Sequence, residues 1–286
     1  MNQIKTSIII PVYNEEEAIE RVIADLKIYL SQGCEIVVVN DGSTDQTKEI
    51  LEKISNIKII HHSENRGYGA AIKSGVQKSQ GEYVLIIDAD GSYPSKSISE
   101  LISQKDYYDM VVGARINSKS QIPLSRRPTK WVLNQLANYL TKTKIPDLNS
   151  GLRIIQRNAL NRFMHLLPDG FSFTTTITLA FLTNGYKVKY LPINYYKRKG
   201  KSKIRPIRDT LNFLQLIIKT VLYFNPLKIF IPLSFIILAL AIIIGAGSFL
   251  FAPKFMDTAF IVLCATALQT FFFGLLAEII VHTRQR

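Results

Sequence analysis

The 286-residue sequence is poor in cysteine and in acidic residues. Its two cysteines, Cys34 and Cys264, lie in different regions, which argues against a disulfide-stabilised scaffold. There are 22 acidic residues against 35 basic ones, a formal net charge of +13. Such an excess suits a nucleic acid or an anionic membrane surface as a partner. The hydrophobic content of 47% beside 20% charged residues excludes a disordered chain.

Charge is missing altogether from two stretches near the carboxyl end, residues 229–252 and 258–277. A helix needs about 20 apolar residues to cross the hydrocarbon core of a bilayer, which is about 30 Å thick, and both stretches reach that length. We therefore predict two membrane-spanning helices. The short connection at residues 253–257 makes them a hairpin, so both ends of the pair face the same side of the membrane.

Basic residues gather on one side of this predicted hairpin. Seven of them fall between Lys197 and Arg208 without an acidic residue, and Arg284 and Arg286 follow the second stretch. Lys254 alone lies on the opposite side. The positive-inside rule therefore predicts that the amino-terminal domain and both termini are cytoplasmic. Anionic lipid, rather than nucleic acid, then accounts for much of the net charge.

Residues 207–224 alternate apolar with polar and basic side chains, as in a helix that lies along a membrane surface. The alternative is that this helix is the last one of a soluble domain. We predict a catalytic domain over residues 1–203, juxtamembrane amphipathic helices over residues 204–227, and a two-helix hairpin with a short tail over residues 228–286.

Within residues 1–203, short apolar runs alternate with helix-length amphipathic stretches, as in parallel strands joined by crossover helices. The predicted strands are residues 7–12, 35–39, 57–61, 83–87, 110–112, 152–155 and 188–195. The predicted helices are residues 15–30, 44–54, 70–79 and 95–104. Strands made of isoleucine and valine must be covered on both faces. The predicted fold is therefore a three-layer α/β/α sandwich of Rossmann-like type.

Polar turns follow three of these strands, at residues 13–15, 40–43 and 88–91. Ligands of such sheets bind beyond the carboxyl ends of the strands, so we expect the three turns to line one crevice. Asp88 and Asp90 repel each other unless a cation lies between them, and Mg²⁺ or Mn²⁺ prefers such oxygen ligands. A purely structural role for this turn is the alternative, and Asp41 could equally cap the helix that follows it.

Four motifs stand in a characteristic order: Pro11-Val12-Tyr13-Asn14-Glu15, Asn40-Asp41-Gly42-Ser43-Thr44-Asp45, Asn65-Arg66-Gly67-Tyr68-Gly69-Ala70-Ala71 and Asp88-Ala89-Asp90-Gly91. In this order and spacing the chain resembles family 2 glycosyltransferases of the GT-A fold, and more narrowly the dolichyl- or polyprenyl-phosphate sugar synthases. The resemblance covers about residues 5–205. It implies an enzyme that transfers a hexose from a nucleotide sugar to a polyprenyl or dolichyl phosphate with inversion at the anomeric carbon.

The resemblance also assigns residues to roles. It implies Mg²⁺ or Mn²⁺ at Asp88 and Asp90. The implied nucleotide-binding residues are Pro11, Tyr13, Glu15, Asp41, Asp88 and Lys203. Ser92 stands where dolichyl-phosphate mannose synthases usually have glutamine, so UDP-glucose is favoured as the donor and GDP-mannose comes next.

Two further segments match the family's acceptor side: Asp147-Leu148-Asn149-Ser150-Gly151-Leu152-Arg153 and Arg198-Lys199-Gly200-Lys201-Ser202-Lys203. A lipid phosphate and a departing diphosphate need cations, which arginine and lysine supply. The predicted catalytic residues are Asp88, Asp90, Asp147 and Arg198. The predicted acceptor-phosphate residues are Arg115, Arg126, Arg127, Ser150, Arg153 and Ser202.

Two rival functions remain open. A processive polysaccharide synthase would need a Gln-x-x-Arg-Trp helix and more spans, but the sole tryptophan, Trp131, follows Thr129-Lys130. A non-catalytic, membrane-anchored nucleotide-binding scaffold is the other rival. We expect a homo-oligomer, such as a tetramer, because two spans per chain are few. His61 and His62 lack a third ligand at metal-like spacing and are predicted to form a solvated turn.

Overall fold

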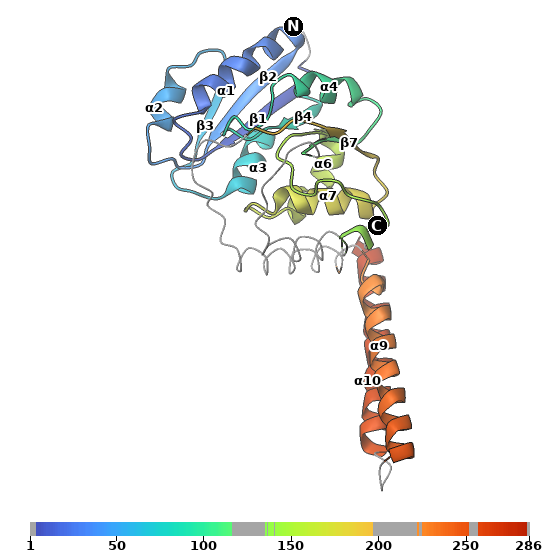
Figure 1. Cartoon of the computed structure of the whole chain (residues 1–286). Helices are drawn as coiled ribbons and strands as arrows, with labels where there is room; N and C mark the ends of the chain where they lie inside the picture. The colour runs from blue at the N-terminus through green and yellow to red at the C-terminus, as the bar shows by residue number, and fades with distance from the viewer. Residues whose placement is uncertain are drawn as a thin grey trace. The chain divides into compact units, whose positions relative to one another are not determined.

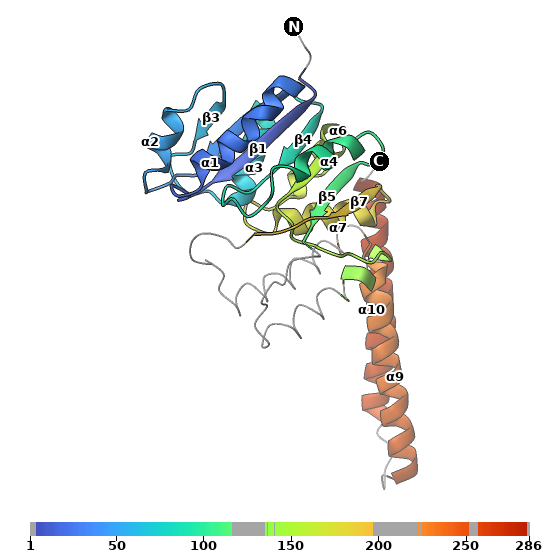
Figure 2. The same ribbon diagram turned by 45° about the horizontal axis from the view of Figure 1, so that its top comes forward.

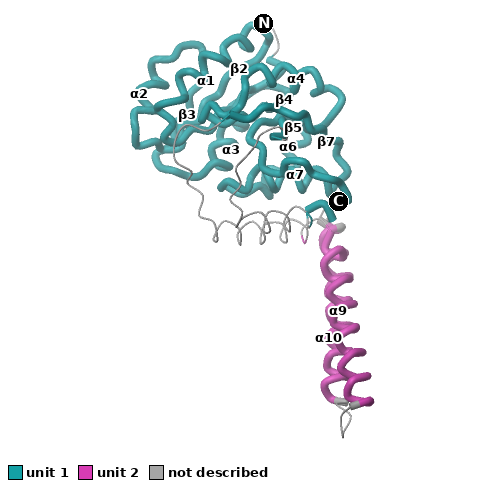
Figure 3. The backbone as a smooth tube through the Cα atoms, in the orientation of Figure 1, with its two compact units in different colours: residues 1–214 teal, residues 215–286 magenta. Residues whose placement is uncertain are grey.

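The structure is a computed structural model of the chain, which describes residues 4–115, 135, 137–139, 141–196, 222, 225–251 and 257–284. The chain divides into two compact units, residues 1–214 and residues 215–286 (Figure 3). The predicted amphipathic helix of residues 207–224 and the basic run from Lys197 to Arg208 fall almost wholly outside the described residues.

A seven-stranded sheet in the order β3-β2-β1-β4-β6-β5-β7 forms the centre of the first unit (Figure 1). The strands are β1 (Thr6–Val12), β2 (Cys34–Asn40), β3 (Lys58–His61), β4 (Tyr83–Ile86), β5 (Met110–Ala114), β6 (Arg153–Gln156) and β7 (Val188–Pro192). Each overlaps a run predicted from the sequence. The strands are fully buried in β1, β4 and β5, as their isoleucine and valine content requires.

One strand departs from the predicted parallel arrangement. β6 runs antiparallel to both of its neighbours, with Arg153 opposite Ile86 of β4 and opposite Val112 of β5. Its amino end therefore lies at the edge of the sheet where β1, β2 and β4 have their carboxyl ends. The segment before β6 is thereby carried to the same edge as the turn after β4. Apolar patterning could not reveal this, because a buried strand has the same composition in either direction.

Helices cover both faces of the sheet, which confirms the predicted three-layer sandwich (Figure 2). They are α1 (Ile19–Leu26), η1 (Lys27–Gln32), α2 (Thr47–Glu52), α3 (Tyr68–Lys78), α4 (Ser97–Gln104), α6 (Arg157–Phe163), η3 (Met164–Leu166) and α7 (Phe173–Thr183). Ile8 and Ile10 of β1 pack in one core with buried side chains of α1 and α4. Ile9, between them in the sequence, faces α3, where Gly75 permits close approach.

Helices α6 and α7 were not predicted. α7 is buried along Phe173–Phe181, so it has no polar face to mark a helical period. Its threonines resemble a strand in composition. In the structure they turn their hydroxyls back on the helix, and Thr178 Oγ1 donates to the carbonyl of Thr174 at 2.8 Å.

The second unit contains an antiparallel pair of long apolar helices, α9 (Leu227–Phe251) and α10 (Asp257–Arg284). Residues Leu227–Leu250 and Thr258–Val281, 24 each, are long and apolar enough to cross a membrane, as predicted. The two helices approach closely at glycines. A Cβ on Gly274 would lie 2.6 Å from the Cβ of Phe230, and one on Gly245 would lie 2.8 Å from the ring of Phe260.

Because of these contacts, the hairpin should be destabilised by a large side chain at Gly274 but should tolerate one at Gly247. We expect Gly274→Leu to lower the thermal midpoint of the detergent-solubilised protein, because overpacking of a tight contact costs about 1–3 kcal/mol. Gly247→Leu is the control, since nothing lies within 4 Å of a Cβ at that position. Equal midpoints for the two variants would contradict the packing described here.

Candidate active site

The turns after β1 and β2 are bonded to each other. Asn14, with a positive φ of 54°, accepts the backbone N–H of Thr44 at 2.8 Å and donates its own backbone N–H to Ser43 Oγ at 3.0 Å. Glu15 donates its backbone N–H to Thr47 Oγ1 at 3.0 Å. The first two predicted motifs, which carry Pro11, Tyr13, Glu15 and Asp41, thus form one rigid corner at the edge of the sheet. Their nucleotide role stays a prediction.

Asp41 lies at the end of β2 with a side chain only 4% exposed. Its Oδ1 accepts the backbone N–H of Arg66 at 2.9 Å, and its Oδ2 accepts that of Gly67 at 2.8 Å. His62 Nδ1 contacts Asp41 Oδ1 at 2.6 Å, with the imidazole 5% exposed. The prediction that His62 belongs to a solvated turn was therefore wrong. The sequence carried no signal for this pairing, because it depends on β2 and β3 lying side by side.

Asp88 follows β4 and is held on two sides. Tyr68, the first residue of α3, donates its hydroxyl to Asp88 Oδ1 at 2.8 Å. On the other side lies Gly151, where a Cβ would overlap both carboxylate oxygens of Asp88. Burial and, after it, the negative charge of Asp90 raise the pKa of Asp88 to about 6, although the hydrogen bond from Tyr68 opposes the rise.

Asp90 is also buried, and Ser92 is its hydrogen-bond partner. Ser92 donates both its backbone N–H, at 3.0 Å, and its hydroxyl, at 2.5 Å, to Asp90 Oδ1. The serine therefore orients Asp90. Among the described residues no cluster of three or more His, Cys, Asp or Glu could hold a metal ion. Asp88 and Asp90 nevertheless fit a hard divalent ion that takes its other ligands from substrate phosphates and water, because such an ion relieves their mutual repulsion.

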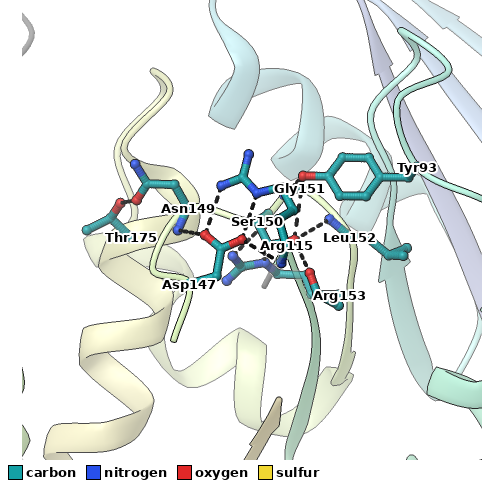
Figure 4. A network of polar contacts seen from close by, with 10 residues as sticks. Tyr93, Arg115, Asp147, Asn149, Ser150, Gly151, Leu152, Arg153 and Thr175 are labelled. Atoms are coloured by element: carbon teal, nitrogen blue, oxygen red, sulfur yellow. Dashed lines mark hydrogen bonds and ion pairs between the residues drawn. The ribbon is translucent and has the colours of Figure 1, made fainter. Parts of the chain in front are cut away.

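Arg115 and Asp147, predicted for two different roles, form one ion pair (Figure 4). Arg115 donates Nε to Asp147 Oδ2 at 2.6 Å and Nη2 to Oδ1 at 2.8 Å, a bidentate arrangement. Burial alone would raise the pKa of Asp147, but Arg115 holds it below its usual value. The guanidinium also lies over the ring of Tyr195, 5.3 Å from its centroid.

Ser150 and Arg153 take structural positions in place of the acceptor contacts predicted for them. Both are fully buried. Ser150 donates its hydroxyl to the carbonyl of Gly113 at 2.5 Å. Arg153 donates to the carbonyls of Ser150 and Thr174, at 2.5 and 3.0 Å, and to Thr178 Oγ1 at 3.0 Å. These contacts secure the segment before β6, in which Figure 4 shows Ser150 next to Gly151, so both residues support the site from within the core.

Tyr93 completes this support. Its hydroxyl accepts the backbone N–H of Gly151 at 2.7 Å, and its ring packs edge-on against Tyr195. Burial raises the pKa of Tyr93 well above its usual value, which keeps it neutral. Gly151 is thus held against Asp88 by Tyr93 on one side and by the bonds of Ser150 and Arg153 on the other.

Several predicted residues lie outside the described part of the chain: Arg126, Arg127, Arg198, Ser202 and Lys203. Sequence reasoning, for its part, passed over Tyr68, Tyr93 and Phe171. Phe171 is 78% exposed and stacks on Tyr68 with ring centroids 5.7 Å apart. Tyr68 belongs to a quoted motif, which was a usable signal. Tyr93 and Phe171 gave none, because their partners, Gly151 and Tyr68, lie far from them in the sequence.

Comparison with known sequences places these residues in a family. Residues 7–164 match Glycosyl transferase family 2, which is more than half of the chain. The chain belongs to this family. Residues 225–282 of this family 2 glycosyltransferase match a second family, the GtrB C-terminal hairpin, which is the segment that contains α9 and most of α10.

Individual relatives extend the match. A dolichyl-phosphate hexose transferase of Haloferax volcanii is 31% identical over 202 residues, covering 70% of this chain and 86% of that protein. An undecaprenyl-phosphate 4-deoxy-4-formamido-L-arabinose transferase of Yersinia enterocolitica is 33% identical over 171 residues, covering 56% and 51%. The structure of glucosyl-3-phosphoglycerate synthase from Mycobacterium tuberculosis, solved with Mn²⁺, UDP and phosphoglyceric acid, superposes with a TM-score of 0.62 at 17% identity, covering 76% and 78%. That likeness confirms the GT-A fold.

The contact between Gly151 and Asp88 gives a direct test of the site. We expect Gly151→Ala to reduce glycosyl transfer by about a hundredfold, because the added methyl group displaces a carboxylate by about 1 Å or more from its working position. Gly170→Ala is the control, since nothing lies within 4 Å of a Cβ there. Retention of activity in Gly151→Ala would show that the position of Asp88 does not matter.

The raised pKa of Asp88 gives a second test. A carboxyl with a pKa of about 6 is neutral below that pH and binds a cation poorly there, since the proton and the metal compete. We expect the Mn²⁺ concentration for half-maximal activity to rise about tenfold for each pH unit below 6 and to level off above it. Melting curves at each pH control for acid unfolding. A flat dependence from pH 5 to 8 would contradict this assignment.

Proposed function

We propose that this enzyme moves a hexose from a nucleotide sugar to a polyprenyl or dolichyl phosphate, with inversion at the anomeric carbon. The observation that carries the proposal is the position of Asp88 and Asp90 after β4, with Asp88 against Gly151 of the segment before β6, in a chain that also contains two helices able to span a membrane. The names of the Haloferax and Yersinia relatives support a lipid-phosphate acceptor.

Asp88 and Asp90 would hold Mg²⁺ or Mn²⁺ together with the donor diphosphate. When bound, the ion neutralises charge on the leaving diphosphate as a Lewis acid. Tyr68 and Ser92 orient the two carboxylates, and burial at the foot of the crevice strengthens their electrostatic effect. The Mycobacterium synthase, solved with Mn²⁺ and UDP, supports a divalent ion and a uridine nucleotide. UDP-glucose remains the favoured donor and GDP-mannose the second.

The acceptor phosphate is anionic at neutral pH, so its oxygen attacks without a strong general base. Catalysis then consists of positioning and charge neutralisation. Arg115 is the described arginine best placed for this task, because Asp147 and the ring of Tyr195 fix its guanidinium close to the segment before β6. Roles for Arg126, Arg127, Arg198, Ser202 and Lys203 in binding phosphate stay part of the proposal. Asp147 serves as the orienting partner of Arg115.

The membrane arrangement is likewise proposed. Two spans with a basic preponderance on one side favour a cytoplasmic catalytic domain and cytoplasmic termini. Such an arrangement confines the lipid acceptor to the two dimensions of the membrane. The domain boundaries at residues 203 and 227 and a homo-oligomeric assembly, such as a tetramer, belong to the same proposal.

The proposal is tested with purified protein, a short polyprenyl phosphate and a panel of UDP- and GDP-sugars. We expect transfer to depend on Mn²⁺ or Mg²⁺, and we expect Asp90→Asn to lose about 10²–10³-fold in kcat/KM with Mn²⁺ present, because one ion ligand is removed. Asp25→Asn, at an exposed position of α1, is the matched control.

Near-normal turnover of Asp90→Asn would remove the metal role. No product with any sugar nucleotide would favour a nucleotide-binding scaffold instead. A polymeric product would favour a processive synthase.

A further inference from the structure

The strongest unassigned feature is a buried polar network that joins the ends of β2 and β3 to α3. Its members are the carboxylate of Asp41, the imidazole of His62 and the hydroxyl of Ser74 on α3. His62 bridges the other two, with Nδ1 at 2.6 Å from Asp41 Oδ1 and Nε2 at 2.9 Å from Ser74 Oγ. Neither the Asp41 nor the His62 side chain is more than 5% exposed. A buried polar network of this kind is costly unless every member is satisfied.

The chemistry of the groups sets the direction of the bonds. An ionised carboxylate only accepts hydrogen bonds, so His62 donates from Nδ1 to Asp41. Nε2 of the ring is bonded to the Ser74 hydroxyl, which can either donate or accept. Asp41 also accepts the backbone N–H groups of Arg66 and Gly67. Three donors thus converge on one carboxylate and leave it little freedom to rotate.

The carboxylate of Asp41 fixes the backbone directly before α3. Gly67 has a φ of 105°, and its backbone packs against Asp169, where a Cβ would lie 2.5 Å from the carbonyl oxygen. The next residue is Tyr68, whose hydroxyl meets Asp88. A shift of the Arg66–Gly67 backbone would therefore move Tyr68 relative to Asp88. His62 is bonded to Asp41, and Asp41 is bonded to the backbone N–H groups of Arg66 and Gly67. Gly67 precedes Tyr68, which donates to Asp88, so the contacts from His62 to Asp88 are continuous.

The loop of residues 62–67 is also in contact with the turn after β2. The backbone N–H of His62 donates to the carbonyl of Asn40 at 2.9 Å. Gly42, with a φ of 68°, lies so close that a Cβ would be 2.5 Å from the backbone of Glu64. The loop of residues 62–67 therefore lies against the corner predicted to hold the nucleotide, and it also leads to Asp88.

We propose that His62 is a positioning residue that fixes the loop of residues 62–67 through Asp41, and so aligns the nucleotide corner with Asp88. This inference rests on the proposed function. His62 acts through Asp41 and the backbone of residues 62–67, so its loss should weaken the binding of donor and metal more than the rate at saturation.

The test compares His62→Leu, which fills the space without a donor, with His62→Asn, whose side-chain amide can replace Nδ1 as donor to Asp41. We expect His62→Leu to raise both the KM for the donor and the half-saturating Mn²⁺ concentration about tenfold, with kcat within about threefold of wild type. His62→Asn should restore both values to within about threefold of wild type. His165→Ala, an exposed histidine on η3, is the control.

A second measurement is independent of activity. Amide hydrogen exchange of the peptide spanning residues 62–70 should be faster by about tenfold in His62→Leu and near wild type in His62→Asn. Wild-type exchange and wild-type KM in His62→Leu would overturn the inference. So would equal losses in the two variants, which would indicate packing alone. If wild-type protein transfers no sugar at all, the proposed function fails, while the exchange data still decide the role of His62.

Discussion

The site depends on the confinement of one carboxylate. Burial and the negative charge of Asp90 both disfavour the ionised form of Asp88, and its pKa is raised to about 6. Tyr68 and Gly151 enclose it from two sides, and Gly151 is in turn held by Tyr93, Ser150 and Arg153. A cation between the two aspartates would relieve their repulsion. This tight support explains why so many polar groups around Asp88 are buried and hydrogen-bonded.

The reversed direction of β6 makes this confinement possible. A parallel strand at that place would put its amino end, and hence residues 147–152, at the far edge of the sheet. Because β6 is antiparallel to β4 and β5, the Arg115–Asp147 pair and Gly151 reach the edge that carries Asp88. Three sheet strands and the start of α3 thus contribute residues to one edge of the sheet. The same edge holds the network of Asp41 and His62, which is bonded to the backbone of Gly67 next to Tyr68, the partner of Asp88.

Two residues illustrate how a role changes once the fold is known. Arg153 has the residue type expected of a phosphate ligand, yet it is fully buried and donates to carbonyls of its own chain. Ser92 follows Asp90 closely in the sequence, and in the structure it orients that carboxylate. In both cases the residue holds a neighbouring part of the candidate site in place. The second unit follows simpler physics, since glycines at 245 and 274 admit the rings of Phe260 and Phe230 between two apolar helices.

The sequence by itself determined the sandwich, the hairpin of apolar helices and the family, because these follow from local periodicity, from uncharged runs of sufficient length and from contiguous motifs. It could not determine the direction of β6, the buried helix α7, the pairing of Arg115 with Asp147 or the partner of His62. Those depend on contacts between residues far apart in the chain, which have no local pattern. Tertiary structure decided which polar side chains of the candidate site are buried in hydrogen bonds to their own chain, as Arg153 is.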